Sequence, residues 1–129
     1  MRDPVIREFL LAFWKVHILH HAAEQGVYGQ WMLEELRHHG YHLSPGTLYP
    51  MLARMAKRGW LRATEPKRSK AARVYRLTAR GREVLTQILD SLDELYREVG
   101  EHHAMSRQSR LSGTKRLQPK HHTARKSSR

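Results

Sequence analysis

Hydrophobic side chains recur at helical spacing in four stretches of the chain and at strand spacing in two shorter ones. The first helical stretch is apolar around much of its circumference, so it should be buried on two sides. The other three carry narrower apolar stripes, which are typical of amphipathic helices. The predicted helices cover residues 4–25, 29–40, 44–59 and 79–99, and the predicted strands cover residues 60–64 and 73–77.

This order of elements predicts a mainly α fold with a small β-hairpin. Two helices joined by a brief turn and followed by a hairpin match a winged helix-turn-helix, and the last long helix lies outside that unit. We therefore expect a DNA-binding domain over residues 1–78, a long C-terminal dimerisation helix over residues 79–104, and a disordered basic tail over residues 105–129.

The helix at residues 44–59 combines a clear start with a basic outer face. Ser44 is a favoured N-cap, whose hydroxyl can accept from a free backbone amide, and Pro45 suits the first helical position. The 3.6-residue period predicts one buried face and one outward face that carries three cations and no acid. The buried face holds Leu48, Leu52 and Met55, and the outward face holds Thr47, Pro50, Met51, Arg54, Lys57 and Arg58.

We interpret this segment as the recognition helix, with Thr47, Pro50 and Arg54 facing base edges in the major groove. The basic hairpin tip is placed as a wing against the phosphate backbone. The residues expected to contact phosphates are Ser44, Tyr49, Lys57, Lys67, Arg68, Lys70 and Arg73. Solvated charges on an ordinary amphipathic helix and loop remain the alternative, and Tyr49 suits the core equally well.

The last helix carries apolar residues at steps of three and four, which is the pattern of a coiled-coil seam. The over-apolar first helix is a candidate partner for this seam across a dimer axis. The dimerisation residues expected are Phe9, Phe13, Leu85, Ile88, Leu92, Leu95 and Val99. Packing of the last helix onto its own domain is the alternative. An apolar cavity lined by Phe9, Trp14 and Tyr96 is the candidate effector site.

The 129 residues carry a net charge of +12, and residues 105–129 hold eight cations and no acid. Such a surface attracts polyanions, either nucleic acid or an anionic membrane. No segment is apolar enough to span a bilayer and no secretory signal is evident, so a cytoplasmic location without membrane contact is expected. The absence of cysteine excludes disulfides and thiolate metal sites.

Ten histidines raise the question of a metal. His17 and His21 are one helical turn apart and His20 lies beside them, but a specific site needs a further ligand, for which Glu24 or His42 are candidates. Partly buried or surface histidines with ordinary hydrogen bonds are the simpler interpretation. The chain shows no motif for phosphate binding or nucleophilic catalysis, so neither an enzyme nor a cofactor is expected.

A longer set of residues resembles the PadR family of bacterial transcriptional regulators. The resemblance spans roughly residues 5–100 and rests on Tyr28-Gly29, Leu36, Gly40-Tyr41, the run from Leu43 to Pro50, Leu52, Gly59-Trp60-Leu61, the run from Arg73 to Thr78, and Gly81. It implies a winged helix-turn-helix homodimer that represses by binding a near-palindromic operator on double-stranded DNA. Some family members respond to small aromatic or drug-like inducers and others to metals.

Two other function classes stay open at this point. The basic surface and tail would also suit an architectural or RNA-binding protein, because charge alone does not distinguish nucleic acids. A metal-responsive regulator using His17, His20 and His21 is the second alternative.

Overall fold

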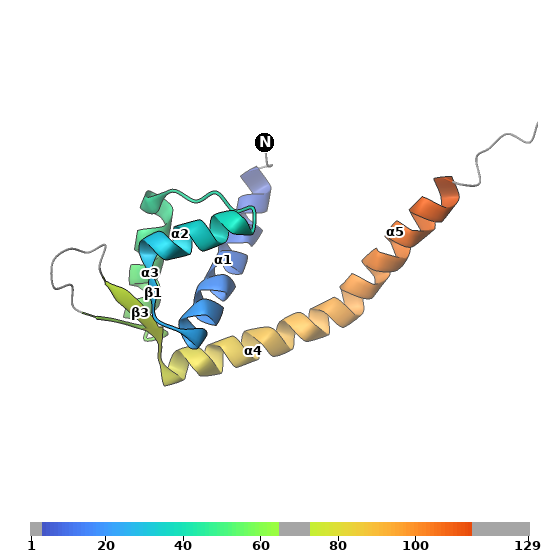
Figure 1. Cartoon of the computed structure of the whole chain (residues 1–129). Coiled ribbons are helices and arrows are strands. Elements are labelled where there is room, and N and C mark those ends of the chain that lie inside the picture. The colour runs from blue at the N-terminus through green and yellow to red at the C-terminus, as the bar shows by residue number, and fades with distance from the viewer. Residues whose placement is uncertain (1–3, 65–72, 115–129) are drawn as a thin grey trace, which may run out of the picture. The chain divides into compact units, whose positions relative to one another are not determined.

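The structure, a computed structural model, describes residues 4–64 and 73–114, with side chains described as far as residue 111 (Figure 1). It confirms a mainly helical fold with a small antiparallel sheet. The elements are α1 (Pro4–Glu24), β1 (Val27–Tyr28), α2 (Gly29–His38), α3 (Pro45–Lys57), β2 (Leu61–Ala63), β3 (Val74–Leu77), α4 (Ala79–Leu95), a π-helical turn η2 (Tyr96–Gly100) and α5 (Glu101–Thr114).

The chain divides into two compact units, residues 1–90 and residues 91–129. The first unit holds α1 to β3 and residues 79–90 of α4. The boundary therefore lies inside α4, at Asp90, and not at Thr78 as the sequence suggested. The reason is that the first turns of α4 pack on the core of the first unit through Val84, Leu85 and Ile88.

The sheet has three strands in the order β1-β3-β2, all antiparallel. The hairpin of β2 and β3 was predicted, and its register pairs Leu61 with Leu77 and Ala63 with Tyr75. The strand β1, which pairs Val27 with Tyr75, was not predicted. Two residues are too few to show alternation, and their partner strand lies far away in the sequence.

The core of the first unit gathers apolar side chains from every helix and strand around α2 and α3. Among the described residues it holds no polar or charged side chain that is buried. Such a core is stabilised mainly by removal of apolar surface from water. Its members are Trp14, Ile18, Leu19, Ala22, Val27, Met32, Leu33, Leu36, Leu48, Met51, Leu52, Met55, Leu61, Tyr75 and Leu85.

The helix α3 begins at Pro45 as predicted, but the cap differs from expectation. The carbonyl oxygen of Ser44 accepts from the amides of Thr47 and Leu48 at 3.0 and 3.1 Å, while its side chain makes no capping hydrogen bond. The prediction that the hydroxyl caps the helix is therefore wrong. Instead, Ser44 Oγ donates to Thr47 Oγ1 at 3.3 Å.

The buried stripe of α3 is wider than the sequence suggested. Leu48, Leu52 and Met55 are buried as predicted, but Met51, placed on the outward face, is only 1% exposed. The helix packs against both α2 and β2, so it needs an apolar face broad enough for two neighbours. Gly40 and Gly59, both in the left-handed conformation, follow α2 and α3 and terminate these helices.

Thr78 caps α4 as predicted. Its hydroxyl oxygen accepts from the Gly81 amide at 2.9 Å, and its carbonyl oxygen accepts from the Arg82 amide at 2.9 Å. The amide of Thr78 in turn donates to the Trp60 carbonyl at 3.1 Å, which fixes the start of α4 to the end of α3 and the beginning of β2.

Helical structure continues beyond the predicted end of the last helix. The π-helical turn η2 and α5 carry it to Thr114, so the expectation of disorder is wrong for residues 105–114, and residues 115–129 lie outside the described part. Extending an existing helix avoids the cost of nucleation, and Ala104, Met105 and Gln108 are good helix formers. No helix in the described ranges has the length and hydropathy needed to cross a membrane.

Gly81 gives a stability test of the junction between α3, β2 and α4. A Cβ at this position would lie 2.1 Å from the Trp60 carbonyl oxygen, which is backbone and cannot turn aside. Gly81→Ala should therefore lower the free energy of unfolding by about 1 to 3 kcal/mol, the usual cost of overpacking, as measured by urea denaturation.

The exposed neighbour Arg80 supplies the control. It forms an exposed ion pair with Glu83, so Arg80→Ala should change the free energy of unfolding by less than about 1 kcal/mol. Equal stability of Gly81→Ala and the unmodified chain would contradict the close approach of α4 to Trp60.

Candidate nucleic-acid interface

The outward face of α3 is basic and open to solvent. Pro50, Ala53, Arg54, Lys57 and Arg58 are all exposed, and the helix contains no acidic residue. Three of the residues predicted from the sequence to contact DNA, Pro50, Arg54 and Lys57, therefore lie on one accessible surface. A run of cations without acids is the electrostatic pattern that binds a phosphate backbone.

Arg58 is partly engaged within the molecule. Its guanidinium carbon lies 5.2 Å from the centre of the Trp60 ring, within the range of a cation–π contact. Lys15, Arg54, Arg58 and Trp60 also line a small hollow of about 30 Å³ between α1 and the end of α3. The hollow is too small for an organic ligand.

The N-terminus of α3 is also accessible. Ser44 and Gly46 are exposed and Thr47 is half-buried. Arg7, from α1, donates from Nη2 to Thr47 Oγ1 at 3.3 Å. This adds a cation to the interface that the sequence did not indicate, because Arg7 lies 40 positions away and only the packing of α1 brings it here.

For Tyr49, the sequence allowed either a place in the core or a phosphate contact. Its side chain is half-buried, packs against the core, and lies over Gly29 so closely that a Cβ there would be 2.4 Å from Tyr49 Cε1. The ring therefore positions α3 against the first residue of α2. A phosphate contact by its hydroxyl remains a prediction.

The wing is described only in part. Arg73 precedes β3 and is half-buried, and its Nε atom is buried without a hydrogen-bond partner. Arg73 is thus less available to phosphate than expected. Lys67, Arg68 and Lys70 lie outside the described residues.

The predicted dimerisation residues differ in how far they are buried. Leu85 is 7% exposed, and the half-buried Ile88 packs on the same core, so both contact their own domain, as the alternative expected. Their part in a dimer seam stays a prediction. Leu92 is half-buried. The residues that keep exposed apolar side chains are Phe9, Phe13, Leu95 and Val99.

The three candidate effector residues differ in burial. Trp14 is a core residue, 6% exposed, with its ring edge-on to Tyr41 at 6.3 Å between centroids. It does not line an open pocket as predicted, because the α2–α3 connection covers it. Phe9 and Tyr96 are 61% and 69% exposed, so each presents an aromatic surface to solvent.

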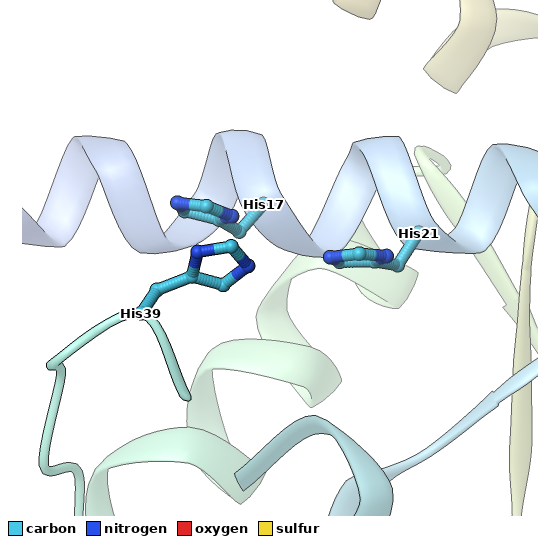
Figure 2. Close-up of side chains that lie close together, drawn as sticks. All are labelled: His17, His21 and His39. Carbon is cyan, nitrogen blue, oxygen red and sulfur yellow. The ribbon is translucent and has the colours of Figure 1, made fainter. Parts of the chain in front are cut away.

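Histidines from α1 and from the connection after α2 lie close together. Figure 2 shows His17 and His21 projecting from the same side of α1 toward His39, which follows α2, and their ligand nitrogens all lie within 4.8 Å of one another. His20, His21 and Glu24 form a second, overlapping group. The sequence suggested Glu24 as a further ligand but missed His39.

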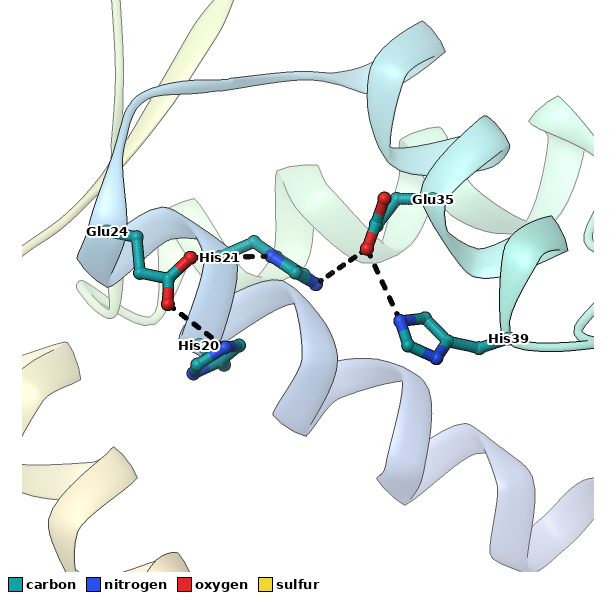
Figure 3. Close-up of polar contacts among 5 residues, drawn as sticks. All are labelled: His20, His21, Glu24, Glu35 and His39. Atoms are coloured by element: carbon teal, nitrogen blue, oxygen red, sulfur yellow. Dashed lines mark hydrogen bonds and ion pairs between the residues drawn. The ribbon is translucent and has the colours of Figure 1, made fainter.

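Glu35 lies between two of these rings. Its Oε1 is 3.5 Å from His21 Nε2 and 3.3 Å from His39 Nε2 (Figure 3). Burial is the main cause that lowers the pKa of both His17 and His21, and neighbouring histidines lower it further. The Glu35 carboxylate partly opposes this effect by raising both pKa values. These rings are therefore biased toward the neutral form.

Comparison with known proteins decides the family. Residues 18–87 match the family described as "Transcriptional regulator PadR-like family". The chain is also 48% identical over 95 residues to "Transcriptional regulator Rv3488" of Mycobacterium tuberculosis, covering 73% of this chain and 89% of that protein. The protein belongs to the PadR-like family.

Solved structures agree with this assignment. A PadR-like transcriptional regulator from Bacillus cereus superposes with a TM-score of 0.65 at 27% identity, covering 73% of this chain and 94% of that one. A PadR family regulator from Eggerthella lenta gives 0.62 at 26% identity, covering 75% and 83%. The chain is thus a PadR-like transcriptional regulator with a winged-helix fold, and its family and relatives are regulators rather than enzymes.

Gly46 tests whether the N-terminus of α3 approaches DNA closely. A Cβ at Gly46 would meet only Ser44 Oγ, at 3.7 Å, so nothing inside this PadR-like regulator requires glycine there. Gly46→Ala should raise the free energy of unfolding by about 0.4 to 1 kcal/mol, because alanine restricts the unfolded chain. The same variant should bind duplex DNA less tightly, as measured by fluorescence anisotropy.

A gain in stability with unchanged DNA affinity would place the DNA elsewhere. A loss of stability would instead show that the start of α3 is packed differently.

Proposed function

We propose that this PadR-like regulator is a homodimeric repressor that binds a near-palindromic operator on double-stranded DNA through α3. The observation that carries the proposal is the acid-free outward face of α3, on which Arg54 and Lys57 are exposed while the opposite stripe is held in the core. Repression by operator binding is what membership of the family suggests.

The proposed contacts divide by position along the helix. Thr47, Pro50 and Arg54 face base edges: Thr47 and Pro50 lie in the first two turns of α3, and the exposed Arg54 lies in its last turn. Arg7 and Lys57 flank them and hold phosphates on either side. In a two-fold dimer, two copies of α3 separated by about 34 Å would enter successive major grooves of one duplex face.

Exposed apolar side chains support dimerisation. The N-terminal half of α1 carries Val5, Ile6, Phe9 and Phe13, all at least 44% exposed. In the second unit, Leu95, Tyr96 and Val99 are at least 53% exposed. Surfaces of this kind are usually covered in an assembly. The aromatic groups of Phe9 and Tyr96 also support the proposal of a small aromatic or drug-like inducer at such an interface.

Arg54 provides the direct test of operator reading. Genomic fragments enriched on the protein supply the specific site, and affinity is then measured on that site and on random-sequence duplex. Arg54→Ala should reduce the discrimination between the two by about 1 to 3 kcal/mol, roughly 5- to 150-fold, if its guanidinium reads a guanine.

The control is Arg82→Ala, which removes the same charge from an exposed position on α4 and should leave discrimination unchanged. Equal losses on both duplexes would reassign Arg54 to a phosphate. Failure of the unmodified chain to enrich any fragment over bulk DNA would refute sequence-specific binding and favour an architectural role.

Phe9 tests the proposed dimer. Because its ring is 61% exposed, Phe9→Glu should leave the fold intact but place a carboxylate in the apolar face of α1. Light scattering at micromolar concentration should then show a monomer, whereas Tyr28→Ser, another exposed aromatic, should stay dimeric. A dimeric Phe9→Glu, or a monomeric unmodified chain, would contradict the assigned interface.

A further inference from the structure

The group formed by His17, His21 and His39 has the composition of a metal site. Three neutral imidazoles are a ligand set that zinc and similar divalent transition metals prefer. Two of the rings come from one face of α1 and the third comes from the residue after α2 (Figure 2). A site built from two separate segments, as here, can hold an ion that neither segment would bind alone.

The distances allow ligation after small side-chain movements. The three ligand nitrogens lie within 4.8 Å of one another, whereas tetrahedral zinc with bonds of about 2.0–2.1 Å sets its ligands roughly 3.4 Å apart. Each ring must therefore shift by about an ångström or less. The rings of His17 and His39 already lie with centroids 4.7 Å apart, and the side chain of His39 is 46% exposed.

The carboxylate of Glu35 lies beside two of the three rings. It lies within ion-pair distance of Nε2 of both His21 and His39 (Figure 3). The His21 Nε2 atom is buried, and its 3.5 Å approach to Glu35 does not have hydrogen-bond geometry, so it lacks a hydrogen-bond partner. A buried nitrogen of this kind is normally satisfied, and an ion between the rings and the carboxylate would satisfy it.

The electrostatic environment agrees with this arrangement. Burial and the neighbouring histidines lower the pKa of His17 and His21, so their lone pairs are not blocked by protons near neutral pH.

The overlapping group of His20, His21 and Glu24 is the rival site. It shares His21, but His20 and Glu24 are 52% and 60% exposed and both lie on α1, within four residues of each other. Exposed ligands from one helix are common without an ion. The first group is better enclosed and draws on two elements.

We propose that His17, His21 and His39 bind one zinc-class divalent ion, with the Glu35 carboxylate beside two of the rings. The ion would join α1 to the end of α2, immediately before the connection that leads to α3. Metal binding would then stabilise the arrangement of the three helices in the first unit. This site does not depend on the DNA-binding proposal.

The test is titration of the full chain with Zn²⁺, followed by calorimetry and thermal denaturation, with Co²⁺ absorption to report the ligand geometry. One ion per chain should bind, should raise Tm by about 5 °C or more at saturation, and should give the visible bands of tetrahedral cobalt. His39→Gln and His17→Gln should each weaken binding at least tenfold, and Glu35→Gln should weaken it about tenfold.

Matched variants separate the site from the chain's other histidines. His38→Gln adjoins His39 in sequence but lies outside both groups, and His20→Gln removes a ligand of the rival group alone; both should keep the affinity of the unmodified chain. Because His39 is exposed, His39→Gln keeps its fold and remains informative even if the more enclosed variants do not. Unchanged binding in His39→Gln, or loss of binding in His20→Gln, would overturn the assignment.

Discussion

The structure depends on the burial of one face of α3. Leu48, Met51, Leu52 and Met55 are each at most 1% exposed, and each large apolar side chain contributes about 1.5 to 3 kcal/mol when fully buried. Turning the helix about its axis would expose this stripe and bury Arg54 and Lys57 without partners, at a high cost in desolvation. The core therefore fixes which side of α3 faces outward. This orientation places Arg54 and Lys57 in solvent.

Local signals in the sequence predicted most of the elements. Pro45 marks the start of α3, Thr78 caps α4, and the alternation around β2 and β3 identifies the hairpin, because each of these depends on neighbouring residues. The strand β1 was missed because its pairing with β3 is long-range. Leu85 was assigned to a dimer seam because a seam and an intramolecular contact produce the same spacing.

In the candidate sites too, local features were predicted from the sequence and long-range contacts were missed. The exposed cations of α3 were predictable from helical periodicity alone. By contrast, Arg7 reaches Thr47, and His39 reaches His17, only because α1 packs beside α2 and the start of α3. A sequence pattern shows which residues share a helix face but not which faces meet. His17 and His21 were therefore recognised as a pair, while their partner His39 was not.

The central claim is that the outward face of α3 lies against DNA. Because the chain has no cysteine, a single thiol can be introduced at the exposed position Ala53 as Ala53→Cys, with Thr86→Cys on α4 as the reference. The measurement is the rate of thiol alkylation with and without the enriched duplex. Duplex should slow alkylation of Ala53→Cys strongly and leave that of Thr86→Cys unchanged. Equal rates for Ala53→Cys in the free and DNA-bound protein would contradict the account.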